Sequence, residues 1–306
     1  MIVCCGEALI DMLPRQSTLG EAAFSPFPGG AVFNTAIALG RLGAPVEFLT
    51  GLSSDFFGDM LRQALTASGV LTSYARVSNR PTTLAFVRLT DGQASYLFYD
   101  EGTAGRMLVA ADMPPLGPEI TAMLFGAISL IPEPCGGAYE ALLAREHTSR
   151  VIMLDPNIRP GFIPDADSHR ARIRRMAAMS DIVKFSDEDL SWFDAAGSLE
   201  ARARSWLDHG ARLVLVTRGR KGALAVTRDH TIEVAAPRVS IVDTVGAGDT
   251  FNAGVLASLS QQGLLSKAGI GAIGAPAIRA ALELGVRAAA VTVSRAGANP
   301  PWAREL

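Results

Sequence analysis

Few residues in this sequence could cross-link a small fold or hold a transition metal. Three cysteines, Cys4, Cys5 and Cys135, and four histidines occur among 306 residues. An odd and sparse set of cysteines gives no disulfide framework, and Cys4 and Cys5 lie in an apolar run that is typical of a buried strand. The histidines are scattered, without the spacing of a zinc site. These features exclude a disulfide-rich domain and give no sign of a zinc centre.

Excess charge and long apolar runs are also missing. The 28 Lys and Arg residues against 30 Asp and Glu give a formal net charge of −2, with no basic run that would favour nucleic acid or an anionic membrane. No apolar run reaches the roughly 18 residues that a membrane span needs. The N-terminal segment lacks a basic stretch and carries Glu7 and Asp11, unlike a signal peptide. We therefore expect a cytoplasmic protein with no nucleic-acid and no membrane partner.

Two common nucleotide-binding motifs are absent as well. A G-x-G-x-x-G pattern starting at Gly246 would require glycine at position 251, which is Phe251. The pattern G-x-x-x-x-G-K-[ST] occurs nowhere in the chain. The sequence therefore offers neither a dinucleotide fingerprint nor a P-loop, which argues against a dehydrogenase.

What the chain does contain is a regular alternation of short apolar runs and amphipathic segments. Apolar residues make up 49% of the sequence, enough for a full core. We predict strands over 2–6, 46–52, 122–130, 150–157, 181–186, 212–219 and 239–245, and a hairpin over 222–236. We predict helices over 31–43, 54–69, 136–147, 167–179, 187–194, 198–209 and 276–293, and a long one at Asp249. This rhythm is typical of a mostly parallel sheet flanked by helices.

One segment breaks the rhythm. The β-rich runs 82–90 and 93–100 flank Asp91-Gly92, and an Asp-Gly pair between such runs is a strong hairpin signal. Because this hairpin lies outside the alternating series, we expect it to form a separate small sheet with the polar stretch 13–28.

The predicted fold is therefore an α/β domain over 1–306 with a doubly wound, mostly parallel sheet. Its β-sheet lid is formed by about 12–28 and 74–104.

The segment VDTVGAGDTFNAGV, residues 242–255, packs Gly246, Ala247 and Gly248 directly before Asp249 and the predicted helix. Unpaired backbone N–H groups and the helix dipole favour an anion there, and the small residues let a phosphate approach closely. A carboxylate repels a nearby phosphate, so its presence at this position indicates a function. Removing a proton from an attacking hydroxyl group is such a function. An acid-capped helix after a tight turn is the alternative interpretation.

Other polar or small residues fall at predicted strand ends and helix starts. Gly29, Gly30 and Asn34 open one helix, and Asp11 follows the first strand. Asn157 and Arg159 follow another strand, and arginine is a natural clamp for a phosphate or substrate. Each of these residues also has an ordinary interpretation as a turn, an exposed side chain or a surface loop.

The ends of two more predicted strands carry residues that could bind a cofactor. Lys184 precedes Asp187, Glu188 and Asp189, acids that suit Mg²⁺ bound through water or simply a solvated helix start. The turn with Gly219 and Gly222 suits the edge of a nucleotide or a plain turn. Together these candidates favour a binding site, because open α/β sheets bind ligands at the carboxyl ends of their strands.

This set of motifs resembles the ribokinase-like (PfkB) carbohydrate kinases. DTVGAGDTFNAG, residues 243–254, is similar to their C-terminal signature, and GGAVFNTAIALGRLG, residues 29–43, to their N-terminal Gly-Gly signature. Order and spacing agree over essentially the whole chain. Within the family, the segments 6–14, 95–108, 128–134, 155–162 and 293–301 resemble those of bacterial fructokinases.

The resemblance implies transfer of the γ-phosphate of ATP, with Mg²⁺, to a sugar hydroxyl group. It leaves open whether a monovalent cation such as K⁺ takes part. It implies that Asp249 is the catalytic base and that the 246–249 backbone is an anion hole. Asp11, Gly30 and Asn34 would hold the sugar with Gly29 beside them, and Arg159 and Arg106 would contact substrate or phosphate. The residues implied on the nucleotide side are Asn157, Lys184, Thr217, Gly219, Gly222 and Asn299.

The family often carries an N-x-x-E motif for its metal-bound water. Here Ser186 stands for the Asn and Asp189 for the Glu, so Asp189 is the candidate metal residue, acting through water. Many relatives form dimers through their lids, which the predicted hairpin permits.

Substrate identity stays open at this level. The first candidate is fructose, phosphorylated at its 6-hydroxyl group, and the alternatives are 2-keto-3-deoxygluconate, ribose or a nucleoside. The candidates for tuning this choice lie in the predicted lid: Arg15, Tyr96, Phe98, Glu101 and Arg106. A sugar- or nucleotide-binding protein without catalysis is the alternative of another class, against which the intact Asp249 argues.

Overall fold

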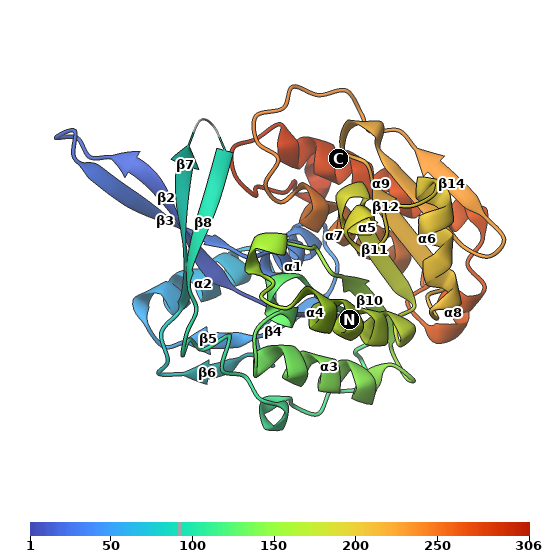
Figure 1. Ribbon diagram of the computed structural model, residues 1–306, viewed down its shortest axis with the longest axis horizontal. Coiled ribbons are helices and arrows are strands. Elements are labelled where there is room, and N and C mark those ends of the chain that lie inside the picture. Colours follow the sequence, from blue (N-terminus) through green and yellow to red (C-terminus); the bar gives the residue numbers. More distant parts are fainter. Residues whose placement is uncertain (91–92) are drawn as a thin grey trace.

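The computed structural model, which describes residues 1–90 and 93–306, is built on an eight-stranded sheet (Figure 1). The order of its strands is β14-β13-β12-β11-β10-β9-β1-β4, and only β13 and β14 run antiparallel to their neighbours. In chain order the strands are β1 (Ile2–Cys5), β4 (Val46–Leu49), β9 (Ala122–Gly126), β10 (Val151–Asp155), β11 (Ile182–Ser186), β12 (Leu213–Thr217), β13 (Ala223–Val226) and β14 (Thr231–Val234). The predicted doubly wound, mostly parallel sheet is confirmed.

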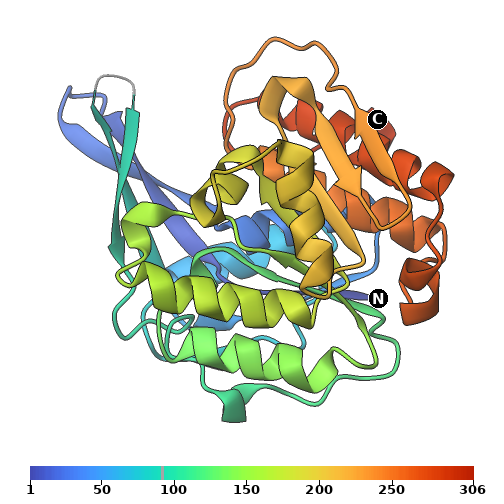
Figure 2. The same ribbon diagram turned by 45° about the vertical axis from the view of Figure 1, so that its right-hand side comes forward.

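Helices cover both faces of this sheet, which explains why its strands are apolar throughout (Figures 1 and 2). Ile2 and Cys4 pack into one hydrophobic cluster, while Val3 and Cys5 pack into the other on the opposite face. The first face holds α1 (Ala31–Arg41), α2 (Phe56–Ala67), α7 (Ala247–Gln261), α8 (Lys267–Gly271) and α9 (Ala275–Val293). The second holds α3 (Cys135–Glu146), α4 (Ala166–Ala178), α5 (Asp187–Phe193) and α6 (Leu199–Asp208).

A separate four-stranded sheet projects from one side of this body and is called the lid here (Figures 1 and 2). Its order is β3-β2-β7-β8, with β2 (Leu9–Gln16), β3 (Ala22–Gly29), β7 (Thr83–Thr90) and β8 (Gln93–Tyr99). The antiparallel pairing of β7 with β8 confirms the predicted hairpin, although its Asp91-Gly92 turn lies outside the described residues. β5 (Gly51–Ser53) and β6 (Arg76–Ser78), which precede and follow α2 in the chain, form a separate two-stranded sheet.

One predicted strand is wrong. Residues 239–245 form an irregular connection before α7 and pair with no strand of the sheet described here. Their alternating apolar pattern favours a strand, but Val239, Ile241 and Val242 are exposed, and β14 ends the sheet without a further partner. The short helix α8 is missing from the prediction, because its five residues carry too little periodicity to be recognised.

None of the helices in the described ranges has the length and hydrophobicity to cross a membrane. Helices α7 and α9 pack closely against each other. A Cβ atom built on Gly254 would lie 2.7 Å from the Cα atom of Gly285, and one on Gly285 would lie 2.8 Å from the Phe251 ring. Glycine at both positions therefore lets the backbones of α7 and α9 approach closely.

We expect Gly254→Ala to destabilise the protein by about 1–3 kcal/mol, because the added methyl group meets backbone that cannot move aside. Urea unfolding followed by circular dichroism measures the change. Gly161→Ala is the control, since a Cβ atom there has no neighbour within 4 Å. Equal free energies of unfolding for the two variants would contradict this account of the α7–α9 contact.

Candidate active site

Helix α7 begins at the glycine cluster, as the sequence predicts. Gly246 is its N-cap residue with a left-handed φ of 77°, and a Cβ atom there would lie 2.7 Å from the Cβ atom of Ala298. The amides of Gly248 and Asp249 find no acceptor among the described residues. These free N–H groups, together with the dipole of α7, make this helix start suited to an anion.

Asp249 sits in the first turn of α7 and is 8% exposed. Its Oδ2 atom accepts a hydrogen bond of 2.9 Å from Nδ2 of Asn34, one turn into α1. Burial raises the pKa of Asp249 to about 7; Asp155 and Glu7 add to this rise, while Asn34 and Lys184 oppose it. A carboxylate with a pKa near neutral can take up a proton at physiological pH, as a general base must.

A buried ion pair lies beneath this turn. Nζ of Lys184, at the centre of β11, lies 3.1 Å from Oδ2 of Asp155 at the end of β10. Nδ2 of Asn252, in α7, donates to the same carboxylate oxygen at 2.6 Å. The carboxyl ends of β10 and β11 are thereby connected to α7.

A cavity of about 330 Å³ opens in front of Asp249, between the lid and the sheet. It brings together most of the residues predicted for the substrate and for catalysis: Asp11, Gly30, Asn34, Arg159, Gly246, Ala247, Gly248 and Asp249. Asn157, which the resemblance implies on the nucleotide side, also lines this cavity. Tyr96 and Phe98 of β8 line it from the lid. We call it the polar chamber.

The glycine pair before α1 shapes this chamber. A Cβ atom on Gly29 would lie 2.3 Å from Oδ2 of Asp11, its partner strand's side chain, so glycine leaves room for the carboxylate. Gly30 is the N-cap residue of α1 at a φ of 110°, which a side chain rarely adopts. Burial raises the pKa of Asp11 to about 6. The pair therefore holds a desolvated carboxyl group at the chamber wall.

Glu7 belongs to the chamber wall but is not among the candidates from sequence. Its Oε1 accepts hydrogen bonds from the amides of Ala31 and Val32, and its Oε2 accepts one from Ser129. Burial raises the pKa of Glu7 to about 6. An acid placed directly after β1 and Gly6 is the signal that could have identified it, because that position faces the ligand edge of the sheet.

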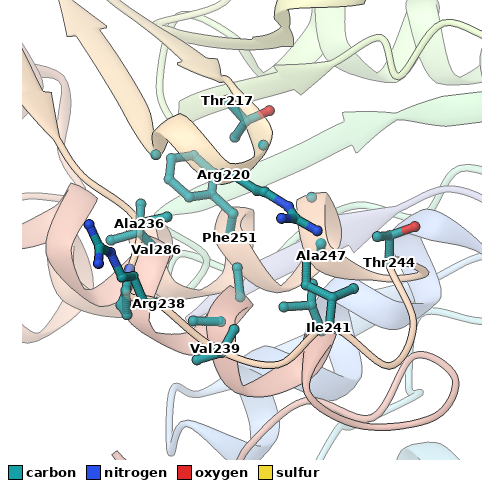
Figure 3. Close-up of a pocket in the computed structure, with 17 residues that line it drawn as sticks. Thr217, Arg220, Ala236, Arg238, Val239, Ile241, Thr244, Ala247, Phe251 and Val286 are labelled. Carbon is teal, nitrogen blue, oxygen red and sulfur yellow. The ribbon is translucent and has the colours of Figure 1, made fainter.

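A second cavity of about 550 Å³ lies between the β12–β14 edge, the 236–241 connection and helices α7 and α9 (Figure 3). Thr217, Gly219 and Gly222, the residues implied on the nucleotide side, line it. Figure 3 shows the Phe251 ring among aliphatic side chains, with Arg220 and Arg238 as the charged groups. We call it the apolar chamber.

Residues 239–245, wrongly predicted to form a strand, contribute side chains to the wall of this chamber. Val239 and Ile241 are exposed because they form a wall of the apolar chamber instead of packing in the core. Thr244, Ala247 and Gly248 line both chambers, so the start of α7 is where the two cavities meet. A group bound there is within reach of both sites. Thr244 is a second residue that the sequence candidates omit.

Some candidates lie elsewhere. Arg106 pairs with Asp100 at 2.9 Å and lines a neighbouring cavity of about 280 Å³ that shares Glu7, Phe98 and Phe162 with the polar chamber. Asn299 is exposed, accepts a hydrogen bond of 2.7 Å from Arg41, and is not among the described residues that line the apolar chamber. Their roles stay predictions.

The acid assigned to the metal is buried and already bonded. Oδ1 of Asp189 accepts from the amide of Ile158 at 2.9 Å, and Oδ2 accepts from that of Ser186 at 2.7 Å. Ser186 in turn caps α5 through its hydroxyl group, so Asp189 holds the loop after β10 against this helix. No group of three or more His, Cys, Asp or Glu in the described part of the chain is arranged to hold a metal ion.

Comparison with known proteins gives a consistent answer. The family described as pfkB family carbohydrate kinase matches residues 1–304. A fructokinase of Rhizobium leguminosarum bv. trifolii is 60% identical over 279 residues, which cover 91% of this chain and 86% of that one. The resemblance inferred from the two glycine motifs is confirmed.

Solved structures agree. A fructokinase from Xylella fastidiosa with bound ATP matches with a TM-score of 0.88 at 29% identity, covering 97% of this chain and 93% of that one. A double mutant of a Vibrio cholerae O395 fructokinase, in a form with fructose, ADP and potassium ion bound, matches with a TM-score of 0.83 at 25% identity, covering 97% and 93%.

We expect Asp249→Asn to raise the melting temperature by several degrees at about pH 8 and by less at about pH 5. The folded-state pKa of about 7 exceeds the ordinary value of 3.8, so ionising this buried group weakens the fold as pH rises between those values. Replacing the carboxyl group removes that cost. Differential scanning calorimetry at both pH values measures the effect, and a gain that does not grow with pH would contradict the assigned burial of charge.

Proposed function

This chain belongs to the pfkB family of carbohydrate kinases, and we propose that the meeting point of its two chambers is where it transfers phosphate. The chain is an ATP-dependent fructokinase. The observation that carries the mechanism is the position of Asp249. It is a buried carboxyl group with a pKa near 7 in the wall of the polar chamber, directly after Gly248, which lines both cavities. A protein that only bound sugar or nucleotide would gain nothing from it.

In the proposed reaction, fructose lies in the polar chamber with its 6-hydroxyl group toward Asp249. Asp249 accepts the hydroxyl proton while the oxygen attacks the γ-phosphorus of ATP, and the bond from that phosphorus to the ADP oxygen breaks. The amides of Gly248 and Asp249 stabilise the charge on the transferred oxygens. Asn34 both orients the Asp249 carboxylate and lines the sugar site, so it ties substrate position to the base.

The charges in the polar chamber support a neutral sugar over an acidic substrate. Glu7, Asp11 and Asp249 contribute three carboxyl groups to its wall, whereas Arg159 is the cation there among the described residues. Arg106, which could otherwise bind the carboxylate of an acidic substrate, is already paired with Asp100. A substrate carboxylate such as that of 2-keto-3-deoxygluconate would face repulsion from most of this wall, while sugar hydroxyl groups can donate to it.

The apolar chamber suits the base and ribose of ATP, whose phosphates would extend to the start of α7. Metal ions accompany nucleotides in the relatives, and the specific ion here is proposed to be Mg²⁺ carried by the phosphates. Mg²⁺ keeps most of its waters, and each Asp189 oxygen retains a lone pair for one of them. The bound Mg²⁺ would neutralise phosphate charge. A role for K⁺ is supported by the potassium ion in the Vibrio structure.

A coupled assay of ADP release tests the function. With Mg-ATP we expect kcat/KM for fructose to exceed that for glucose, mannose, ribose, adenosine and 2-keto-3-deoxygluconate. Asp249→Asn should lower kcat about 10²–10⁴-fold while ATP binding persists, because only the base is removed.

Two outcomes would change the conclusion. A different preferred sugar would keep the mechanism and replace the substrate, whereas near-normal kcat in Asp249→Asn would reject the mechanism. Sugar-induced thermal stabilisation without any turnover would favour a binding protein.

The lid also supports the proposal of a homodimer, which the family resemblance implies. On β8 the side chains alternate, so Tyr96 and Phe98 face the polar chamber while Leu97 and Tyr99 face outward and are 59% and 58% exposed. Phe24, Phe86 and Tyr99 form a row of edge-to-face rings with centroids 5.0 and 5.5 Å apart. An apolar face of this kind marks an interaction surface.

We expect the wild-type chain to sediment at twice its monomer mass at micromolar concentration, and Leu97→Ser with Tyr99→Ser to shift it to the monomer. The shift follows from the loss of apolar area on the outer lid face. Val77→Ser, at a side chain 51% exposed on β6 outside the lid sheet, is the matched control and should stay dimeric. A monomeric wild-type chain would reject the proposal.

A further inference from the structure

We propose that Lys184 supplies part of the positive charge that stabilises the transferring phosphoryl group, acting across the backbone of Gly248. This inference rests on the proposed kinase function and deepens it. It assigns a role in the reaction step to a residue that the family resemblance places only on the side of the nucleotide.

The geometry that carries the inference is the gap left by Gly248. A Cβ atom on this residue would lie 3.2 Å from Nζ of Lys184, the one contact within 4 Å that the described residues outside its own helical turn provide. Gly248 itself lines both chambers at their meeting point. Glycine therefore leaves only the backbone of one residue between the ammonium group and the place where the phosphoryl group passes.

The hydrogen bonding of Lys184 leaves it free to act in that direction. Its ammonium group has three N–H donors, and the described residues provide one acceptor, Oδ2 of Asp155 at 3.1 Å. Asp155 is held from other sides, by Asn252 at Oδ2 and by the amide of Asn157 at Oδ1. The carboxylate thus anchors one N–H of Lys184, and the two others have no acceptor among the described residues.

The ammonium group keeps its charge in spite of its burial. Burial lowers the pKa of Lys184, but Asp155, Asp189 and Asp249 raise it by more, so the net shift is upward. The side chains of Lys184 and Asp155 are 4% and 5% exposed. A charge fixed in such a dry place acts strongly on a neighbouring oxyanion.

A purely structural role explains these features less well. Buried ion pairs are seldom better for stability than apolar residues of similar size, because removing two charges from water is costly. β10 and β11 are already joined as neighbouring parallel strands of the sheet. The pair therefore adds little that the sheet lacks, except a cation behind the first turn of α7.

The test compares Lys184→Met, Asp155→Asn and the double variant Asp155→Asn/Lys184→Met, which has no unpaired charge. We expect the double variant to keep its melting temperature within a few degrees and to lose kcat about 10²-fold, with KM values little changed. Asp155→Asn alone keeps the ammonium group and should lose less than tenfold. Should the double variant fail to fold, Lys184→Gln, which can still donate to Asp155, is judged by the same criteria.

Two further readouts separate charge from structure. ADP with aluminium fluoride and fructose mimics the transferring phosphoryl group, and its affinity should fall about as much as kcat, whereas that of ADP alone should not. Lys184 lowers the pKa of Asp249 and Asp155 raises it, with Asn34 and Glu7 as its other neighbours. The acidic limb of kcat/KM should therefore move up in Lys184→Met and down in Asp155→Asn.

A second Lys–Asp pair is the matched control. Lys267 in α8 lies 2.6 Å from buried Asp181, away from both chambers. Lys267→Met should lower stability and leave kcat unchanged. A double variant of Asp155 and Lys184 with kcat within tenfold of wild type would overturn the proposal while leaving the kinase function intact. A wild-type chain that phosphorylates none of the sugars would instead reject the proposed function.

Discussion

The rest of the site depends on unpaired backbone amides at the start of α7. The helix can begin there only because Gly246 adopts a left-handed conformation against Ala298, where a side chain has no room. That turn brings Gly248 to the wall shared by both chambers and places Asp249 in the first helical turn. Donors without partners favour an anion, and the same turn supplies the base that a nearby hydroxyl group needs. The turn before α7 thus provides both an anion site and a general base for phosphoryl transfer.

Desolvation has opposite consequences for the two sides of this turn. On the chamber side it raises the pKa of Asp249 toward neutrality, which makes the carboxylate a more effective proton acceptor and weakens the fold. On the sheet side, Lys184 and Asp155 are also buried, but their opposite charges are paired at 3.1 Å. Asn34 and Asn252 connect the two layers, since one donates to Asp249 and the other to Asp155. The helix start is therefore held by hydrogen bonds from α1 and from the sheet.

The sequence allows much of this arrangement to be predicted, because parallel strands bring their carboxyl ends to one edge. Asn157 and Arg159 follow β10 and both reach the polar chamber, whereas Asp11 reaches it from β2 of the lid. Local pattern could not reveal long-range partners: the capping of α1 by Glu7 spans 24 residues of chain. The exposed run 239–245 has strand-like alternation but lines a cavity, and apolar side chains at a ligand wall look the same in sequence as those in a core.

The lid has one face toward the polar chamber and one face toward solvent. Its inner face carries Asp11 and Tyr96 into the polar chamber, and Phe98 packs edge-to-face on Phe162 of the body at 4.7 Å. That contact joins the lid to the body at the wall of the chamber, where burial raises the pKa of Asp11 and of Asp249. The alternation of side chains along β8 thus divides the lid: Tyr96 and Phe98 line the polar chamber, whereas Leu97 and Tyr99 stay exposed on the other face.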